Sequence, residues 1–246
     1  MSTKETVTPY GKGKSKKEEV GEMFDSIAPN YDLLNRGTSL GVDTLWRKKM
    51  IAKLDPQQHR RILDVATGTA DVAIQIAKRI GADHITGIDL SNEMLRYGRK
   101  KVTRAKLDEI ITLEQGDSED LPLADNSYDA VTVAFGVRNF ENLEAGLSEM
   151  LRVLRPGGQL VILEFSRIKF APVRALFNFY FGRIMPLIGR LQSKDPRAYS
   201  YLFESVQAFP SGKDFTNILD QVGYKQSKCQ ALTLGIASIY TAYKPD

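Results

Sequence analysis

The sequence predicts an α/β protein built on a mostly parallel sheet with helices on both faces. Short apolar strand patterns alternate with helical patterns from residue 60 to about 165. Two further strand patterns, near 224–231 and 235–243, are separated by about three residues, which is the spacing of a hairpin. Five parallel strands followed by a closing antiparallel hairpin therefore give a seven-stranded sheet.

Each element has a local signal. The five parallel strands are apolar runs expected near 61–65, 84–89, 111–115, 129–135 and 159–165. Helical periodicity predicts helices at 71–80, 92–105, 142–154 and 212–222. Ser91, Asn142 and Ser211 stand where three of these helices need an N-cap. Pro156-Gly157-Gly158 and Gly223 are expected to end the last two.

Composition is that of an ordinary globular protein, with 246 residues, 42% hydrophobic and 26% charged. Residues 1–17 contain five Lys and one Glu, so the whole net charge of +4 lies in this tail. We expect the tail to be disordered, to lack the apolar segment of a secretory signal, and to be dispensable for folding. The lone Cys229 excludes an internal disulfide and is expected in the core, and the two histidines lack the spacing of a metal site.

Residues 18–246 are expected to form one domain. Within it, residues 18–55 carry helical patterns that precede the first strand and form a cap over the carboxyl ends of the strands. Residues 166–197 form a helical insertion that is rich in large apolar and basic residues. No charge-free stretch there approaches the ~20 residues that span a bilayer. Two interpretations stay open, an interfacial or lid element and an ordinary pair of amphipathic core helices.

The turn after the first strand indicates a nucleotide-binding site. It contains one glycine, Gly68, whereas a dinucleotide fingerprint needs three, so a pyrophosphate is not expected. Asp89 ends the second strand, where a carboxylate accepts both hydroxyls of an adenosine ribose. Asp64 and Asp71 beside the turn suit a cationic amino-acid group. An adenosine ligand without phosphates indicates S-adenosylmethionine, and the predicted sheet is that of the methyltransferases that use it.

Two later segments carry further candidates. Asp117 and Ser118 follow the third strand at the same edge of the sheet, where a carboxylate can accept from an adenine amino group. Arg138 and Asn139 follow the fourth strand, and an apolar strand has no need of such a pair at its end. We interpret this pair as catalytic or positioning residues, the alternative being a surface ion pair.

The chain resembles the menaquinone/ubiquinone biosynthesis C-methyltransferases over residues 18–244. The resemblance rests on the residues of 24–32, Phe135-Gly136-Val137-Arg138-Asn139 and Arg152-Val153-Leu154-Arg155-Pro156-Gly157-Gly158. Asp43 stands where the family usually has His, and Leu34 where Met is common. The resemblance implies a class I, Rossmann-like methyltransferase fold and methylation of a ring carbon of a prenylated quinol, with demethylmenaquinol as the first choice.

The resemblance also implies cofactor contacts from Thr69, Asp89, Asp117 and Ser118, while a polar family contact is replaced by Ala134. A phenolic hydroxyl has a pKa near ~10, so ring attack needs help with ionisation. Arg138 at about 4 Å would favour the oxyanion by up to ~4 kcal/mol at an effective dielectric constant of ~20. Tyr31 and Asp71 are both candidates for relaying the proton, and the sequence does not choose between them.

Other functions stay open at this point. They are C-methylation of a ubiquinone-pathway benzoquinol or of another hydrophobic acceptor such as a sterol or lipid, and a non-catalytic subunit that binds S-adenosylmethionine. We expect a cytoplasmic enzyme without a metal or nucleic-acid partner, with a prenylated quinol as substrate. Contact with the inner face of the cell membrane and assembly into a homo-oligomer are left open.

Overall fold

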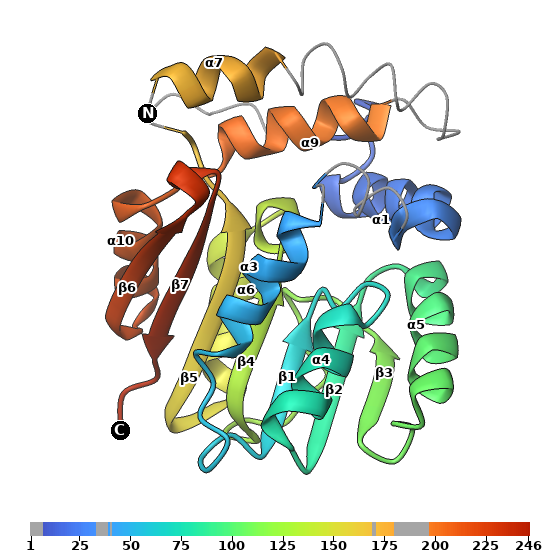
Figure 1. Ribbon diagram of the computed structural model, residues 1–246, viewed down its shortest axis with the longest axis vertical. Helices are drawn as coiled ribbons and strands as arrows, with labels where there is room; N and C mark the ends of the chain where they lie inside the picture. The colour runs from blue at the N-terminus through green and yellow to red at the C-terminus, as the bar shows by residue number, and fades with distance from the viewer. Residues whose placement is uncertain (1–6, 33–38, 40, 169–170, 180–196) are drawn as a thin grey trace.

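The computed structural model describes residues 7–32, 39, 41–168, 171–179 and 197–246 (Figure 1). Its strands form one seven-stranded sheet in the order β3-β2-β1-β4-β5-β7-β6. The first five strands are parallel, and β7 pairs antiparallel with both β5 and β6. The strands are β1 (Arg61–Val65), β2 (His84–Asp89), β3 (Ile111–Gln115), β4 (Tyr128–Ala134), β5 (Leu154–Phe165), β6 (Lys225–Leu232) and β7 (Ala237–Tyr243). The predicted fold class is confirmed.

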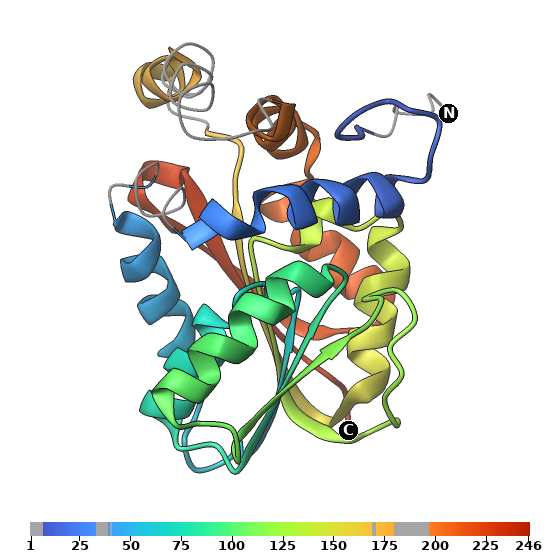
Figure 2. The same ribbon diagram turned by 90° about the vertical axis from the view of Figure 1, so that its right-hand side faces the viewer.

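Helices cover both faces of the sheet (Figure 2). One face carries α3 (Val42–Ile51), α4 (Asp71–Ile80) and α5 (Asn92–Ala105), and the other carries α6 (Leu143–Val153) and α10 (Lys213–Val222). The carboxyl ends of the strands are covered by α1 (Lys16–Ile27), η1 (Ala28–Asn30), α7 (Ala171–Phe179) and α9 (Arg197–Ala208). Two short turns, η2 (Val137–Asn139) and η4 (Thr233–Gly235), follow β4 and β6. Helices therefore cover both faces of the sheet, and the cap covers the edge that is formed by the carboxyl ends of the parallel strands.

Two apolar cores, one on each face of the sheet, hold these layers together. Ile62 and Ile85 pack under α3, α4 and α5, whereas Leu63 and Val131 pack under α6 and α10. Successive residues of a strand point to opposite faces, so β1 contributes to both cores and is buried on both sides. Because β1 is held on both faces in the middle of the sheet, the turn that follows β1 has a fixed position.

Three local expectations are corrected by the structure. Gly212, not Ser211, is the N-cap of α10, and the Ser211 hydroxyl instead accepts from the Arg167 amide at 3.1 Å. Helix α6 ends at Val153 and β5 begins at the next residue, so Pro156-Gly157-Gly158 lies within the strand. Cys229 is exposed, because β6 is the edge strand of the sheet. In contrast, Ser91 and Asn142 cap α5 and α6 as predicted.

The N-terminal segment is tied to the domain within the described residues 7–17. Ser15 and Glu18 form a capping box, so α1 begins at Lys16, before the expected end of the tail at residue 17. The Glu19 carboxylate is buried and accepts from the amides of Tyr10, Gly11 and Lys12 at 2.6, 2.9 and 2.6 Å. Residues 10–12 therefore follow a defined path against α1, which differs from the solvated arm that we expected.

Parts of three expected segments lie outside the described residues. These are 1–6 of the tail, 33–38 and 40 of the cap, which include Leu34, and 169–170 and 180–196 of the insertion. Among the helices that the structure describes, none is long and apolar enough to cross a membrane.

Candidate functional site

The turn between β1 and α4 brings the backbone close to the end of β2. Ala66, Gly68 and Ala70 all have positive φ angles, of 53°, 57° and 63°. Such a backbone is strained for alanine and persists where the surrounding fold imposes a particular path. The Thr67 amide donates to the Ile88 carbonyl at 3.0 Å, so the turn is fixed against β2.

Asp89, the last residue of β2, directs its carboxylate to this turn. Its Oδ2 accepts from the Gly68 amide at 2.7 Å, and its Oδ1 accepts from the Ser91 amide at 2.9 Å. Burial raises the pKa of Asp89 to about 6, although the two amides act in the opposite direction. A carboxylate at this strand end has the placement that hydroxyl groups of a nucleoside require.

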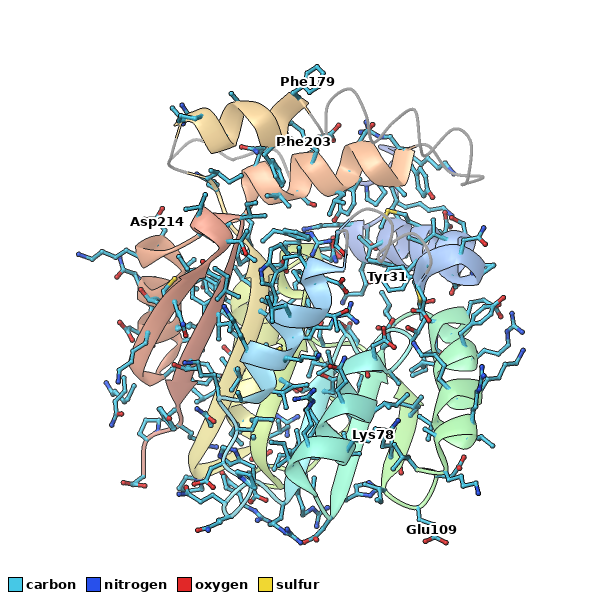
Figure 3. All side chains as sticks on the ribbon, in the orientation of Figure 1. Tyr31, Lys78, Glu109, Phe179, Phe203 and Asp214 are labelled. Carbon is cyan, nitrogen blue, oxygen red and sulfur yellow. The ribbon has the colours of Figure 1, made fainter. Side chains whose placement is uncertain are left out.

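A cavity with about 710 Å³ of empty space, part of it open to solvent, lies between the cap and the carboxyl ends of the strands. On the cap side it is lined by Lys17, Val20 and Phe24 of α1, and Tyr31 lies just below that helix in Figure 3. Six of the residues singled out from the sequence line it, namely Tyr31, Gly68, Asp89, Asp117, Ser118 and Asn139. The structure thus brings together residues from the cap and from the ends of β1 to β4.

Asp64 lies beneath the turn and does not line the cavity. It is 1% exposed and accepts from the hydroxyls of Thr67 and Thr132, both at 2.7 Å. Desolvation raises the pKa of Asp64 to about 6, and the two hydroxyls oppose that shift. This geometry holds the turn against β1 and β4.

Asp71 and Thr69 also lie beside the cavity rather than on its wall. Lys101 of α5 contacts the Asp71 carboxylate, the Thr69 hydroxyl at 3.0 Å and Asp32 at 2.8 Å. Arg47 of α3 pairs with Asp71 at 2.9 Å. Burial alone would raise the pKa of Asp71, but the two cations outweigh it and hold this pKa below its usual range. A carboxylate held by two cations is a weak proton acceptor.

Asp117 is engaged on both carboxylate oxygens. Its Oδ1 accepts from the Glu119 amide at 2.9 Å, and its Oδ2 pairs with the Lys17 ammonium group. Lys17 also lies 3.5 Å from Glu119. A side chain of the cap therefore already contacts the carboxylate that the sequence suggests for an adenine amino group.

Arg138 forms an ion pair, but a buried one. Its Nη1 lies 2.9 Å from Oε1 of Glu164, a residue with 0% exposure, and its guanidinium lies 5.6 Å from the centre of the Phe165 ring. Burial raises the pKa of Glu164, and the Arg138 charge opposes that rise. The neighbouring Asn139 has a buried Oδ1 atom without a hydrogen-bond partner among the residues that the structure describes. The pair lies where β4 and β5 end, next to the cavity.

Sequence reasoning missed Glu164 and Lys101. The signal for Glu164 was available, because it is the single charged residue in the apolar run 160–165. Lys101 has no comparable signal, since lysines on the exposed face of a helix are common. No group of three His, Cys, Asp or Glu side chains in the described part of the chain is arranged to hold a metal ion.

A family model described as the ubiE/COQ5 methyltransferase family matches residues 12–244. The chain belongs to this family. It is 45% identical over 240 residues to a protein of Bacteroides fragilis named demethylmenaquinone methyltransferase, with 98% of each chain covered. It is 47% identical over 230 residues to a Geotalea daltonii protein named ubiquinone/menaquinone biosynthesis C-methyltransferase UbiE, covering 93% of this chain and 97% of that one.

Solved structures agree on the fold. A methyltransferase from Aquifex aeolicus that depends on S-adenosylmethionine superposes with a TM-score of 0.59 at 19% identity, covering 80% of this chain and 89% of that chain. The S-adenosylmethionine-dependent methyltransferase SibL superposes with a TM-score of 0.63 at 19% identity, covering 87% and 59%. As a member of the ubiE/COQ5 family, the chain is a methyltransferase whose cofactor is S-adenosylmethionine. The turn around Gly68 has carboxylates close by and therefore does not suit a phosphate group. This turn and the Asp89 carboxylate at the end of β2 fit that cofactor.

Proposed function

We propose that this enzyme methylates a ring carbon of demethylmenaquinol. The proposal is carried by one structural observation, the cavity at the strand ends with Asp89 on its wall and the buried Arg138 beside it. It is supported by the relatives named demethylmenaquinone methyltransferase, which match nearly the whole chain at 44% and 45% identity.

Asp89 would accept the ribose hydroxyls of the cofactor, and Asp117 with the Ser118 backbone would contact its adenine. Gly68 lets the cofactor approach the turn, while Asp64 and Thr69 hold that turn from behind. When bound, S-adenosylmethionine supplies an electrophilic methyl group on a positively charged sulfur atom.

Arg138 would stabilise the ionised hydroxyl of the quinol, because a cation close to a phenolate lowers its pKa. Glu164 neutralises part of the Arg138 charge and fixes the guanidinium in place. Asn139 lines the cavity and has an unsatisfied side-chain oxygen, which suits it to position the acceptor. Of the two proton-relay candidates, we favour Tyr31, since it lines the cavity whereas Asp71 is held by Lys101 and Arg47.

A benzoquinol of the ubiquinone pathway is the second candidate acceptor. The relative from Geotalea daltonii, at 47% identity, carries a name that covers both pathways. Competition between the two quinols in one reaction would rank them.

A prenylated acceptor is soluble in lipid, so the enzyme would contact a lipid bilayer to reach it. Leu45 of α3, Phe179 of α7 and Leu234 of η4 are exposed large apolar residues, and Leu234 is 71% exposed. The η4 turn lies at the capped end of the sheet, because Ala237 just after it pairs with Phe165 at the carboxyl end of β5. Figure 3 shows Phe179 projecting from the outer side of α7. The residues next to Leu45 and Leu234 are hydrogen-bonded to each other, since Trp46 Nε1 donates to Thr233 Oγ1 at 2.8 Å. This bond joins α3 to η4. We propose peripheral contact through this end, which the triple change Leu45→Ser, Phe179→Ser and Leu234→Ser should weaken in vesicle co-sedimentation.

The function is tested by anaerobic transfer of a labelled methyl group to demethylmenaquinol and to the oxidised quinone. We expect label on the ring carbon of the quinol and none on the quinone, because only the reduced ring ionises. Arg138→Met should reduce turnover strongly and leave cofactor affinity unchanged. Arg96→Met is the matched control, because Arg96 pairs with Glu93 on the exposed side of α5. Equal rates with quinone and quinol, or label on oxygen, would refute the proposal.

A further inference from the structure

Tyr201 of α9 is a buried tyrosine with an unsatisfied hydroxyl group. It is 1% exposed, and its Oη atom has no hydrogen-bond partner among the described residues. The other tyrosines with almost no exposure differ. Tyr224 donates to the Leu147 carbonyl at 3.1 Å, and the Tyr240 oxygen accepts from the Gly212 amide at 2.8 Å.

The unsatisfied hydroxyl belongs to a cluster next to the proposed acceptor site. Helix α9 contacts η2, which carries Arg138 and Asn139. Burial raises the pKa of Tyr201, and the nearby charges of Arg138 and Glu164 act on the same hydroxyl with opposite signs. Tyr201 also belongs to a buried cluster with Val20 and Met23 of α1, and Val20 lines the cavity. Tyr201 therefore lies between the cap and the buried ion pair.

Three polar atoms of this cluster lack hydrogen-bond partners within the described part of the chain, namely Arg138 Nε, Asn139 Oδ1 and Tyr201 Oη. Folded proteins leave very few buried polar atoms unsatisfied, and each exception needs an explanation. Two of the atoms carry hydrogen and act as donors, which is the arrangement that an oxygen anion requires. If Tyr201 had only a structural role, its hydroxyl would be expected to have a hydrogen-bond partner, as the Tyr224 hydroxyl does. Without such a partner, phenylalanine would fill the same place.

We propose that Tyr201 is a further acceptor-binding residue, whose hydroxyl donates a hydrogen bond to the same quinol oxygen that Arg138 stabilises. This inference rests on the function proposed above. A phenol that stays protonated in its buried setting remains a donor while the acceptor oxygen ionises. A second donor also compensates for Glu164, because Glu164 reduces the positive charge that Arg138 presents to the acceptor oxygen. A neutral donor stabilises the oxyanion without a further buried charge.

The change Tyr201→Phe removes only the hydroxyl and is the sharpest test. Because that hydroxyl has no partner among the described residues, we expect the melting temperature to be unchanged or higher. We expect kcat for demethylmenaquinol to fall by about 100-fold, as for the loss of one oxyanion donor, with unchanged affinity for S-adenosylmethionine. Tyr224→Phe is the matched control, since its hydroxyl donates to Leu147 and neither residue lines the cavity. It should lower the melting temperature and leave kcat unchanged.

The outcomes separate the inference from the function on which it rests. If wild type methylates demethylmenaquinol and Tyr201→Phe does so within about threefold of its rate, a margin far below the loss of an oxyanion donor, the inference is wrong and the function stands. A Tyr201→Phe variant that loses both melting temperature and turnover would make Tyr201 a structural residue, which also overturns it. If the wild-type enzyme has no activity on demethylmenaquinol, the proposed function itself is wrong.

Discussion

Lys17 reaches from the first turn of α1 to the Asp117 carboxylate beyond the end of β3, so a cap residue holds the group proposed to bind adenine. An adenine amino group must share or displace this ammonium contact. We therefore expect Lys17→Met to strengthen binding of S-adenosylmethionine by about twofold to fivefold, the range of a partly exposed ion pair. Calorimetry measures it, with Lys14→Met as control, because Lys14 pairs with Glu22 away from the cavity. Weaker binding by Lys17→Met would show that the ion pair holds the cap over the cofactor instead.

Removal of residues 2–17 should lower the melting temperature by several degrees, contrary to what composition alone suggests. The deletion takes away the three amides that satisfy the buried Glu19 carboxylate. It also removes Lys16, whose ammonium group donates to the carbonyls of Arg138 and Phe140 at 3.0 and 2.8 Å. A deletion of residues 2–6 keeps all of these contacts and is the control. Identical melting curves for both deletions would restore the view of a dispensable tail.

Cofactor affinity should fall in mild acid through Asp89. Its pKa of about 6 lies above the ordinary value for Asp, so the carboxylate gains a proton as the pH drops below about 6. A protonated carboxyl group cannot accept from both ribose hydroxyls. We expect the dissociation constant to rise towards roughly tenfold per pH unit below that point, and Asp89→Asn, which is weak throughout, to lack this rise. A wild-type dissociation constant that stays flat down to about pH 5 would contradict the assignment of Asp89.

Two glycines in helices should respond oppositely to alanine. A Cβ atom at Gly98 of α5 would lie 2.9 Å from Leu113 and 3.3 Å from the backbone of Thr69, so α5 is packed against the cofactor turn. Gly98→Ala should cost about 1–2 kcal/mol of unfolding free energy and weaken cofactor binding by shifting the turn. At Gly21 of α1 the nearest atom is a Leu90 methyl at 3.6 Å, so Gly21→Ala should stabilise by ~0.5–1 kcal/mol. Denaturant unfolding of both variants checks the contrast, and a stabilised Gly98→Ala would refute the close packing.

What the sequence predicted correctly depends on short-range physics. The N-caps Ser91 and Asn142 bond to amides three residues away, and the strand that ends at Asp89 has an apolar pattern of its own. The convergence of Asp89 and Asp117 follows from one rule, that the carboxyl ends of parallel strands share an edge, whereas Asp64, also expected at this site, lies beneath the turn.

What it missed depends on partners far along the chain. Ser211 is a good capping residue, but its hydroxyl accepts from Arg167, 44 residues before it. Alternation along β6 indicates a strand without indicating that the strand is the edge, so the exposure of Cys229 was not predictable. The buried partner of Arg138 comes from the neighbouring strand, 26 residues later. Such pairings are decided by strand order and packing, which local patterns do not contain.

The last strand of the chain does not lie at the rim of the sheet but between β5 and β6. During synthesis, β5 and β6 both leave the ribosome with an unpaired edge, and neither can be covered before Ala237–Tyr243 has emerged. A chain that stops before Ala237 would therefore contain most of the core sequence and leave two open strand edges. We expect such products to aggregate or be degraded, so an intact sheet requires the chain to be made through β7.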